Sequence, residues 1–159
     1  MGLEYSETIA MLPTLDPNKL TEREMESAST AYVLTLMVVM VGLPLPIINL
    51  IACIGYYFSI KSKSFFIRYH AMQAMTSQAF IIMMNSVAVS WTLKIIFTDT
   101  RYSKIYFGYV VTVILFNLAD YIMNISSAIR ARKGKLFSFI FFGKLSYMLT
   151  KKYLPQPES

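Results

Sequence analysis

The chain has 159 residues, of which 55% are hydrophobic and 15% are charged, and it carries a formal net charge of +6. Soluble domains average about 25% charged residues, and the apolar residues here lie in long uncharged runs that a soluble core of this size could not bury on every face. The basic residues lie at the ends of these runs, which fits anionic lipid headgroups and argues against a nucleic-acid interface.

Residues 1–26 form an acidic segment that we expect to be a water-facing N-terminal tail. Signal and transit peptides are basic and poor in acidic residues, so we expect no cleaved presequence here. The tail ends in the stretch LTEREM, where Thr21 is predicted to cap a helix and Glu24 to bond back to it. Leu20 and Met25 are predicted to form the hydrophobic pair that often accompanies such a cap.

The first two apolar segments, residues 27–43 and 46–60, flank a proline-rich break at Gly42, Pro44 and Pro46. The second segment is short for the ~30 Å of hydrocarbon in a bilayer. It could therefore form either the second arm of a spanning hairpin or a re-entrant element that enters and leaves on one side. We favour the hairpin, because the prolines fit one headgroup level and the lysines and tyrosines of YYFSIKSK fit the other.

Two longer apolar segments follow, and they are predicted to form spanning helices over residues 68–96 and 105–129, joined by a loop over 98–104. Residues 130–159 are basic and aromatic, so we expect them to lie along the membrane interface, with a fifth span as the alternative. The predicted fold is an all-α membrane protein, a four-helix transmembrane bundle with a proline-broken first hairpin and a C-terminal interfacial segment.

The distribution of basic residues predicts the orientation of the bundle. With an even number of crossings, seven bases lie on the side of the N-terminus and two in the 98–104 loop on the other side. An excess of Lys and Arg marks the cytoplasmic side, so both termini are expected there. The residues predicted to bind headgroups are Lys61, Lys63, Arg68, Arg130, Arg132, Lys133 and Lys135.

Polar side chains recur at helical spacing inside the last two spans. Asp120 lies near mid-membrane, where an ionised carboxylate costs at least about 2.5–3.5 kcal/mol unless it is paired or hydrated. We predict a contact in which Gln73 or His70 hydrogen-bonds Asp120 and Asn124. The predicted intramembrane polar cluster comprises His70, Gln73, Ser77, Asn117, Asp120, Asn124 and Ser127. Such a cluster serves either as interhelical glue worth about 0.6–2 kcal/mol per bond or as a proton or substrate path.

The sequence does not favour catalysis. The single histidine lies near no nucleophile motif, and the single cysteine, Cys53, lies in an apolar run, so neither a catalytic triad nor a clustered metal site is expected. The eleven methionines fit adaptable helix packing. We expect no enzyme activity, no cofactor, no metal and no nucleic-acid partner.

Three stretches, LPLPIINLIACIGYYFSIK, SFFIRYHAMQAM and SSAIRARKGKLFSF, resemble the Tic-twenty-like superfamily over roughly residues 27–142. The resemblance implies four helices with both termini on the cytoplasmic or stromal side, and a translocation role. The acidic tail is similar to the bacterial branch, which implies a multi-pass protein of the bacterial inner membrane. The residues that carry the resemblance are Phe66, Arg68, His70, Ala71, Gln73, Ala74, Ala131 and Gly134.

These observations predict a non-enzymatic accessory or assembly subunit of a larger membrane protein complex. Its expected partners are anionic lipids on the cytoplasmic side and other integral membrane proteins. The alternative is a channel or translocation component with a polar path through the contact between the third and fourth helices.

Overall fold

The computed structural model describes residues 12–13, 15–40, 46–60, 64–98, 101–139 and 142–154. Most of the predicted tail, the Gly42 and Pro44 turn, Lys61, Lys63 and residues 155–159 lie outside this part. The described helices are α2 (Glu22–Met40), α3 (Pro46–Ser59), α4 (Phe65–Phe97), α5 (Lys104–Arg132) and α6 (Gly143–Thr150), with two short 3-10 helices, η1 (Pro17–Lys19) and η2 (Lys151–Tyr153). The described residues contain no strand, which confirms the all-α prediction for them.

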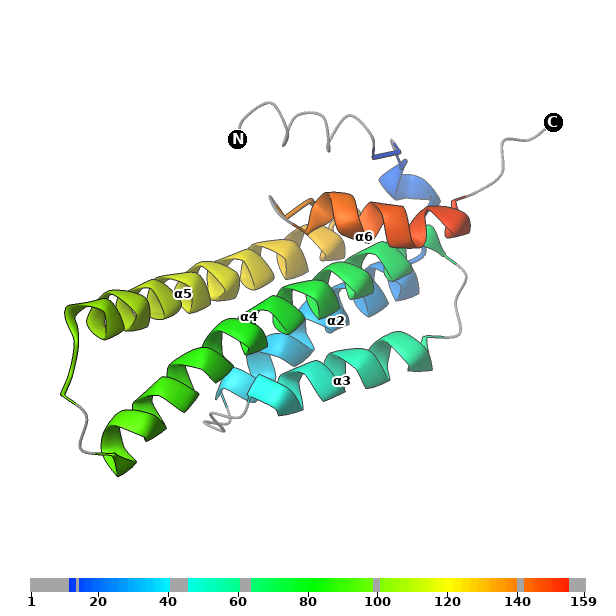
Figure 1. Ribbon diagram of the computed structural model, residues 1–159. Coiled ribbons are helices and arrows are strands. Elements are labelled where there is room, and N and C mark those ends of the chain that lie inside the picture. Colours follow the sequence, from blue (N-terminus) through cyan, green and yellow to red (C-terminus); the bar gives the residue numbers. More distant parts are fainter. Residues whose placement is uncertain are drawn as a thin grey trace.

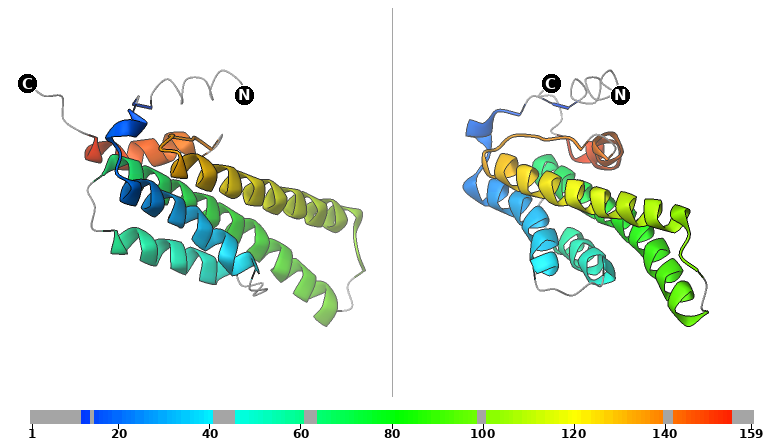
Figure 2. Two further views of the ribbon diagram at one scale, coloured as in Figure 1. Left: turned by 180° about the vertical axis from the view of Figure 1, so that it is seen from behind. Right: turned by 90° about the vertical axis from the view of Figure 1, so that its left-hand side faces the viewer.

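The helices α2 to α5 run alternately in opposite directions (Figure 1). Contacts join α2 to α3, α4 and α5, and α4 also packs against α3, α5 and α6. At the end where α2 begins and α5 ends, all four helices are present, and α6 lies there beside α4 (Figures 1 and 2). At the opposite end, α4 and α5 extend beyond α2 and α3. The bundle therefore has a thick end of packed helices and a thin end formed by one helical hairpin.

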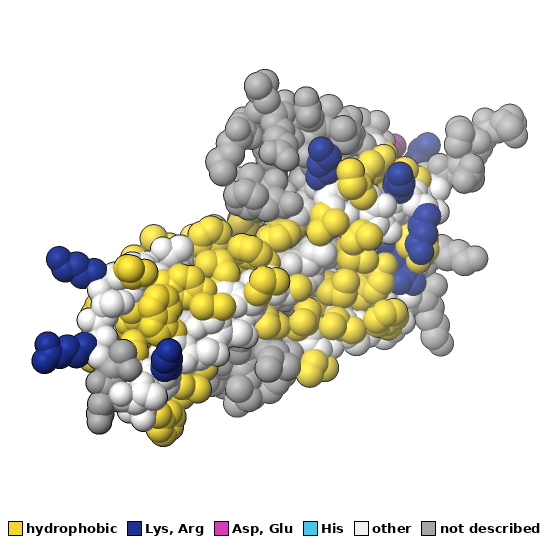
Figure 3. Space-filling view, in the orientation of Figure 1, with side chains coloured by type: hydrophobic (Ala, Val, Ile, Leu, Met, Phe, Trp, Pro, Cys, Tyr) yellow, Lys and Arg dark blue, Asp and Glu magenta, His cyan; other side chains and the backbone are white. Residues whose placement is uncertain are grey.

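Among the described helices, α4 and α5 are long and apolar enough to cross a membrane. They have 33 and 29 residues, or about 50 and 43 Å at ~1.5 Å per residue. Large hydrophobic side chains on their surface are exposed, including Phe107, Ile114 and Leu115. Figure 3 shows this hydrophobic face with Lys and Arg side chains gathered at its two ends. An apolar belt between charged ends is typical of membrane association.

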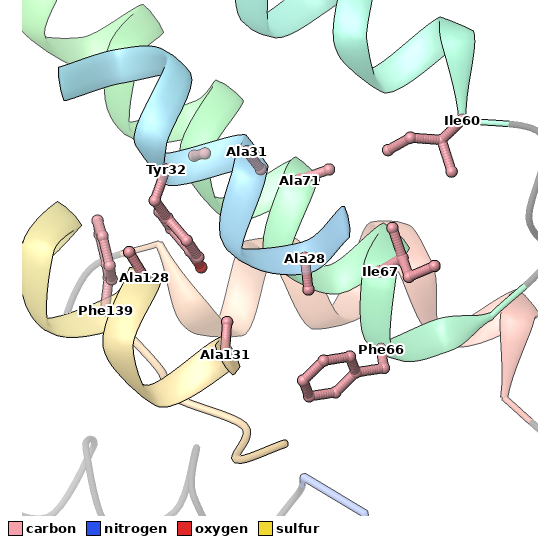
Figure 4. Close-up of a cluster of buried hydrophobic side chains, with 11 residues drawn as sticks. Ala28, Ala31, Tyr32, Ile60, Phe66, Ile67, Ala71, Ala128, Ala131 and Phe139 are labelled. Atoms are coloured by element: carbon pink, nitrogen blue, oxygen red, sulfur yellow. The ribbon is translucent and has the colours of Figure 1, made fainter. Parts of the chain in front are cut away.

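Small residues form the contact surfaces at the thick end. Close packing of helix backbones in membranes favours such residues, because lipid supplies no hydrophobic driving force between helices. Figure 4 shows several of them on α2, α4 and α5, in one cluster with Tyr32, which is fully buried and stacks on Phe139 with ring centroids 6.0 Å apart. The buried alanines are Ala28, Ala31, Ala71, Ala74, Ala128 and Ala131.

The helix start predicted at Thr21 is confirmed. The backbone N–H of Glu24 donates to the Thr21 hydroxyl at 3.2 Å, and the Thr21 N–H donates to the Glu24 carboxylate at 3.0 Å. These reciprocal bonds satisfy backbone donors that a helix N-terminus leaves free. The flanking residues Leu20 and Met25 are both half-buried against the core, so the cap also fixes how the preceding segment enters the bundle.

The same cap predicts a pH dependence of stability. Partial burial raises the pKa of Glu24, but hydrogen bonds from the Thr21 backbone and from the Ser64 and Thr21 side chains outweigh it, so the pKa lies below its usual value of 4.5. A carboxyl whose pKa is lower in the folded state stabilises the fold above the unfolded pKa and loses this effect as the pH falls through the folded pKa. Thermal unfolding in detergent should show wild type losing more stability than Glu24→Gln between neutral pH and about pH 3. Equal losses would contradict this role of Glu24.

The end of α5 depends on a glycine in the left-handed region. Gly134 has φ +68°, and the N–H groups of Gly134 and Lys135 donate to the carbonyls of Ala131 and Arg130, both at 3.0 Å. This pair of bonds is the Schellman arrangement at a helix C-terminus. It turns the chain back across the thick end toward α6.

Gly134→Ala should destabilise the protein by about 1–2 kcal/mol, because an L-residue at this φ is strained. The new Cβ would also lie 3.1 Å from Pro17 Cβ and 3.2 Å from the Met25 sulfur. Gly108→Ala is the matched control, since its Cβ would meet nothing within 4 Å. Denaturation in detergent should give a lower unfolding midpoint for Gly134→Ala than for Gly108→Ala. An unchanged midpoint for Gly134→Ala would contradict the need for glycine at this helix end.

Candidate functional site

The first polar contact is centred on Gln73, which is fully buried in α4. Its side-chain nitrogen donates to the Tyr32 hydroxyl and to the Phe137 carbonyl, both at 3.0 Å. Its side-chain oxygen accepts from the Phe139 N–H at 3.2 Å. One amide therefore joins α2, α4 and the segment that follows α5.

His70 extends this contact, because its Nδ1 lies 2.8 Å from the Tyr32 hydroxyl. The hydroxyl accepts from Gln73, and we assign its own proton to the bond with Nδ1 and the imidazole proton to Nε2. Nε2 is buried and faces the backbone of Lys135. The ring packs edge-on against Tyr32, Phe66 and Tyr69, which is the environment of a packed neutral histidine.

The second polar contact surrounds Asp120 of α5. The Ser77 hydroxyl donates to its Oδ1, and the side-chain amides of Gln78 and Asn124 donate to its Oδ2, each at 2.9 Å. Gln78 and Asn124 are 3% and 1% exposed, whereas Asp120 is half-buried. The carboxylate is therefore held as an acceptor by three donors from two helices.

The predicted partners of Asp120 were wrong in detail. A contact between these two helices exists, but Ser77 and Gln78 make it, whereas Gln73 and His70 bond to Tyr32 and to the segment after α5. The reason is packing, because the polar side chains in the first turns of α4 bond to α2, whereas those in its later turns bond to α5. Ser77 was predicted from its spacing, but Tyr32 and Gln78 were missed.

A third set of polar contacts lies nearer the thin end. The side chains of Asn85 and Asn117 donate to each other at 3.1 and 2.9 Å. Thr92 and Tyr106 share a hydrogen bond of 2.8 Å between their hydroxyls. Gln78, Asn85 and Thr92 are seven residues apart, a repeat that keeps one face of a helix toward its neighbour. That spacing could have revealed the polar seam, but on the α4 side only Ser77 was recognised in the sequence.

The remaining predicted residues occupy other places. Ser127 is buried and donates to the Met123 carbonyl at 2.7 Å, away from Asp120. Arg68 donates to the carbonyls of Tyr57 and Ile60 at 3.2 and 2.5 Å. Since the last carbonyls of a helix lack intrahelical partners, Arg68 closes the end of α3, and its predicted contact with headgroups stays a prediction.

The basic residues in the last turn of α5 and directly after it lie at the thick end of the bundle. The Arg130 guanidinium lies over the Phe137 ring at 4.5 Å, and Arg132 forms a 3.5 Å ion pair with Glu26. Both partners of that ion pair are more than half exposed, so it adds little stability. Lys133 and Lys135 are exposed.

The interactions in these three contacts are hydrogen bonds between side chains and to the backbone. Within the described ranges, no group of three His, Cys, Asp or Glu side chains could hold a metal ion. Cys53 is a buried free thiol. The polar side chains instead form a series of interhelical bonds that fix how α2, α4, α5 and the following segment pack together.

Comparison with known proteins changes the family assignment. Residues 26–146 match the MamF/MmsF family, described as the magnetosome magnetite crystal formation protein family. The resemblance to the Tic-twenty-like superfamily is therefore wrong, and the protein-transport role that it implied loses its support. The residues that suggested it, among them Phe66, Ala71 and Ala74, are buried packing positions, which unrelated helical membrane proteins can share.

No curated protein and no solved structure matches the chain. Since the match covers α2 to α5 and the start of α6, this chain belongs to the MamF/MmsF family of magnetosome membrane proteins.

Proposed function

We propose that this protein is a non-enzymatic accessory or assembly subunit of a larger membrane protein complex in which magnetite crystals form. Membership of the magnetosome crystal formation family supports the setting. One observation carries the accessory role. The polar side chains between α4 and α5, including Asp120 and Tyr106, form hydrogen bonds with one another. Paired groups orient helices, whereas a conducting path needs groups that face water.

In this proposal all four long helices enter the bilayer, with α4 and α5 as its full spans and α2 and α3 as a shorter hairpin beside them. Both termini then lie on one side, the cytoplasmic side of an inner membrane, at the thick end. The proline at the first position of α3, Pro46, suits a helix start. The basic residues support this placement of α4 and α5 in the bilayer. Lys94 and Lys104 lie near one end of the apolar face, and Arg130 and Arg132 lie near the other end.

The helix α6 is proposed to lie along the membrane interface at the thick end. Gly143, Ser146 and Thr150 are buried on one side of it, while Leu145, Met148 and Leu149 are about half exposed. With Lys151 and Lys152 following directly, the segment has the apolar face and basic flank of helices that rest on anionic lipid.

Purification in a mild detergent tests the accessory role. We expect the protein to co-purify with other integral membrane proteins in a fixed ratio, and Asp120→Asn to preserve that association if its folded amount is unchanged. The competing function, a channel through the contact of α4 and α5, predicts ion flux in liposomes that contain the protein alone and loss of that flux in Asp120→Asn. Such flux, without any stable partner, would overturn the accessory role.

A further inference from the structure

A cavity of about 440 Å³ opens at the thick end, between the segment that precedes α2 and the segment that follows α5. Both segments lie at this end of the bundle (Figure 1). The charged residues in its lining are Arg130 and Lys135, and no acidic residue among those that the structure describes lines it. The cavity combines this positive charge with apolar walls, which include Leu12, Leu15, Leu136 and Phe137.

The two cations of the cavity keep their charge for a ligand. In the part of the chain that the structure describes, neither Arg130 nor Lys135 forms an ion pair. The Arg130 guanidinium lies over the Phe137 ring, 4.5 Å from its centroid, and such a contact positions the group without neutralising it. Both side chains are exposed, so an anion can reach them from outside.

The wall that carries Lys135 and Phe137 is held from behind by α4. His70 Nε2 faces the backbone of Lys135. The Gln73 side chain donates to the Phe137 carbonyl at 3.0 Å and accepts from the Phe139 N–H at 3.2 Å. These buried contacts fix the backbone of the wall before any ligand arrives, which lowers the cost of binding. The polar contact around Gln73 therefore also builds the cavity.

The position of the cavity indicates the class of anion. Arg130 lies in the last turn of α5 and follows Ile129, which is 52% exposed at the end of the apolar face. Basic groups at this level of a cytoplasmic membrane surface attract anionic lipids, and a phospholipid carries the phosphate and the hydrocarbon that the two parts of the lining complement. We propose that this cavity binds the headgroup of an anionic phospholipid, with its phosphate on Arg130 and Lys135 and the start of its chains against the apolar walls. This inference rests on the proposed function, which places the thick end at the cytoplasmic membrane surface.

Native mass spectrometry of the full chain in detergent tests the site, since it counts bound lipids and gives their Kd. The probes are dioleoyl phosphatidylglycerol and dioleoyl phosphatidylcholine, which have the same chains but an anionic and a zwitterionic headgroup. We expect the first phosphatidylglycerol to bind about tenfold more tightly, because hydrogen bonds between charged groups are the stronger ones. Glycerol 3-phosphate, which has the phosphate but no chains, should not displace it at an equal concentration.

Two variants separate the cavity from general attraction between the basic surface and the lipid. Arg130→Gln and Lys133→Gln each remove one exposed positive charge at the same helix end, but only Arg130 lines the cavity. We expect Arg130→Gln to lose most of the preference for phosphatidylglycerol and Lys133→Gln to keep it. Equal losses in the two variants would overturn the cavity as the site.

Three other results would also overturn the proposal. Equal affinity for the two lipids would remove the role of the anionic headgroup, and displacement by glycerol 3-phosphate would assign the cavity to a free anion. If Arg130→Gln kept phosphatidylglycerol but lost the co-purifying membrane proteins, the cavity would hold an acidic segment of a partner instead. Loss of lipid binding alone leaves the accessory role intact, because co-purification measures that role separately.

Discussion

Gln73→Leu is expected to lower the free energy of unfolding by about 3–5 kcal/mol, because a buried polar group left without a partner costs about 1–3 kcal/mol. The Phe137 carbonyl and the Phe139 N–H lose this partner, and the Tyr32 hydroxyl keeps only its bond to His70. The substitution keeps most of the side-chain volume, so lost packing contributes little. Reversible unfolding in mixed micelles measures the change.

Two comparisons isolate the hydrogen bonds of Gln73. Ser86→Leu places the same side chain on an exposed position of α4 and should leave the unfolding midpoint almost unchanged. Tyr32→Phe removes one of the three partners, so the double variant with Gln73→Leu should lose less than the sum of the single losses. A substitution at an ordinary surface position costs less than about 1 kcal/mol of unfolding free energy. A loss this small for Gln73→Leu would show that the hydrogen bonds of Gln73 do not stabilise the bundle.

Gly143→Ala is expected to destabilise the thick end by about 1–3 kcal/mol, the usual cost of forcing an extra carbon into a packed site. The new Cβ would lie 1.6 Å from Ser138 Oγ and 2.8 Å from Ser138 Cβ, so α6 or the segment before it must shift. Limited proteolysis should cut the C-terminal segment of the variant faster, and its unfolding midpoint should fall.

A second substitution tests the cause of that effect. Ser138→Gly removes both of the clashing side-chain atoms, so Gly143→Ala combined with Ser138→Gly should recover much of the loss. Gly108→Ala provides the matched control, and it should be neutral or stabilise α5 slightly, since alanine is favoured over glycine in a helix interior. Failure of the double variant to recover any stability would show that the contact with Ser138 is not what excludes a side chain at residue 143.

Local features of the fold were predictable because a few neighbouring residues determine them. The cap at Thr21 and Glu24 depends on a three-residue spacing, and the structure has it as expected. The polar character of one face of α5 likewise follows from spacings of three and four residues. The helix of α4 begins at Phe65 and ends at Phe97, close to the predicted 68–96, because a long uncharged run continues in a helix until polar residues and turns stop it.

The partners of these residues depend on the packing of distant segments and could not be read from spacing. His70 and Gln73 lie on the α4 face that α2 covers, and nothing in their own spacing distinguishes α2 from α5 as the neighbour. The bonds from Arg68 to two carbonyls at the end of α3 also depend on how distant segments pack. The family, likewise, could not be identified from alanine and aromatic positions that close helix packing requires in many membrane proteins.

Cysteine accessibility in sealed membranes tests the central claim most directly, namely that the hairpin of α4 and α5 crosses the bilayer. In a Cys53→Ala background, which removes the only native cysteine, Arg101→Cys reports on the segment between these helices and Lys152→Cys on the thick end. A thiol reagent that cannot cross membranes should label Lys152→Cys only from the cytoplasmic side and Arg101→Cys only from the opposite side. Labelling of both positions from the same side would contradict the spanning hairpin.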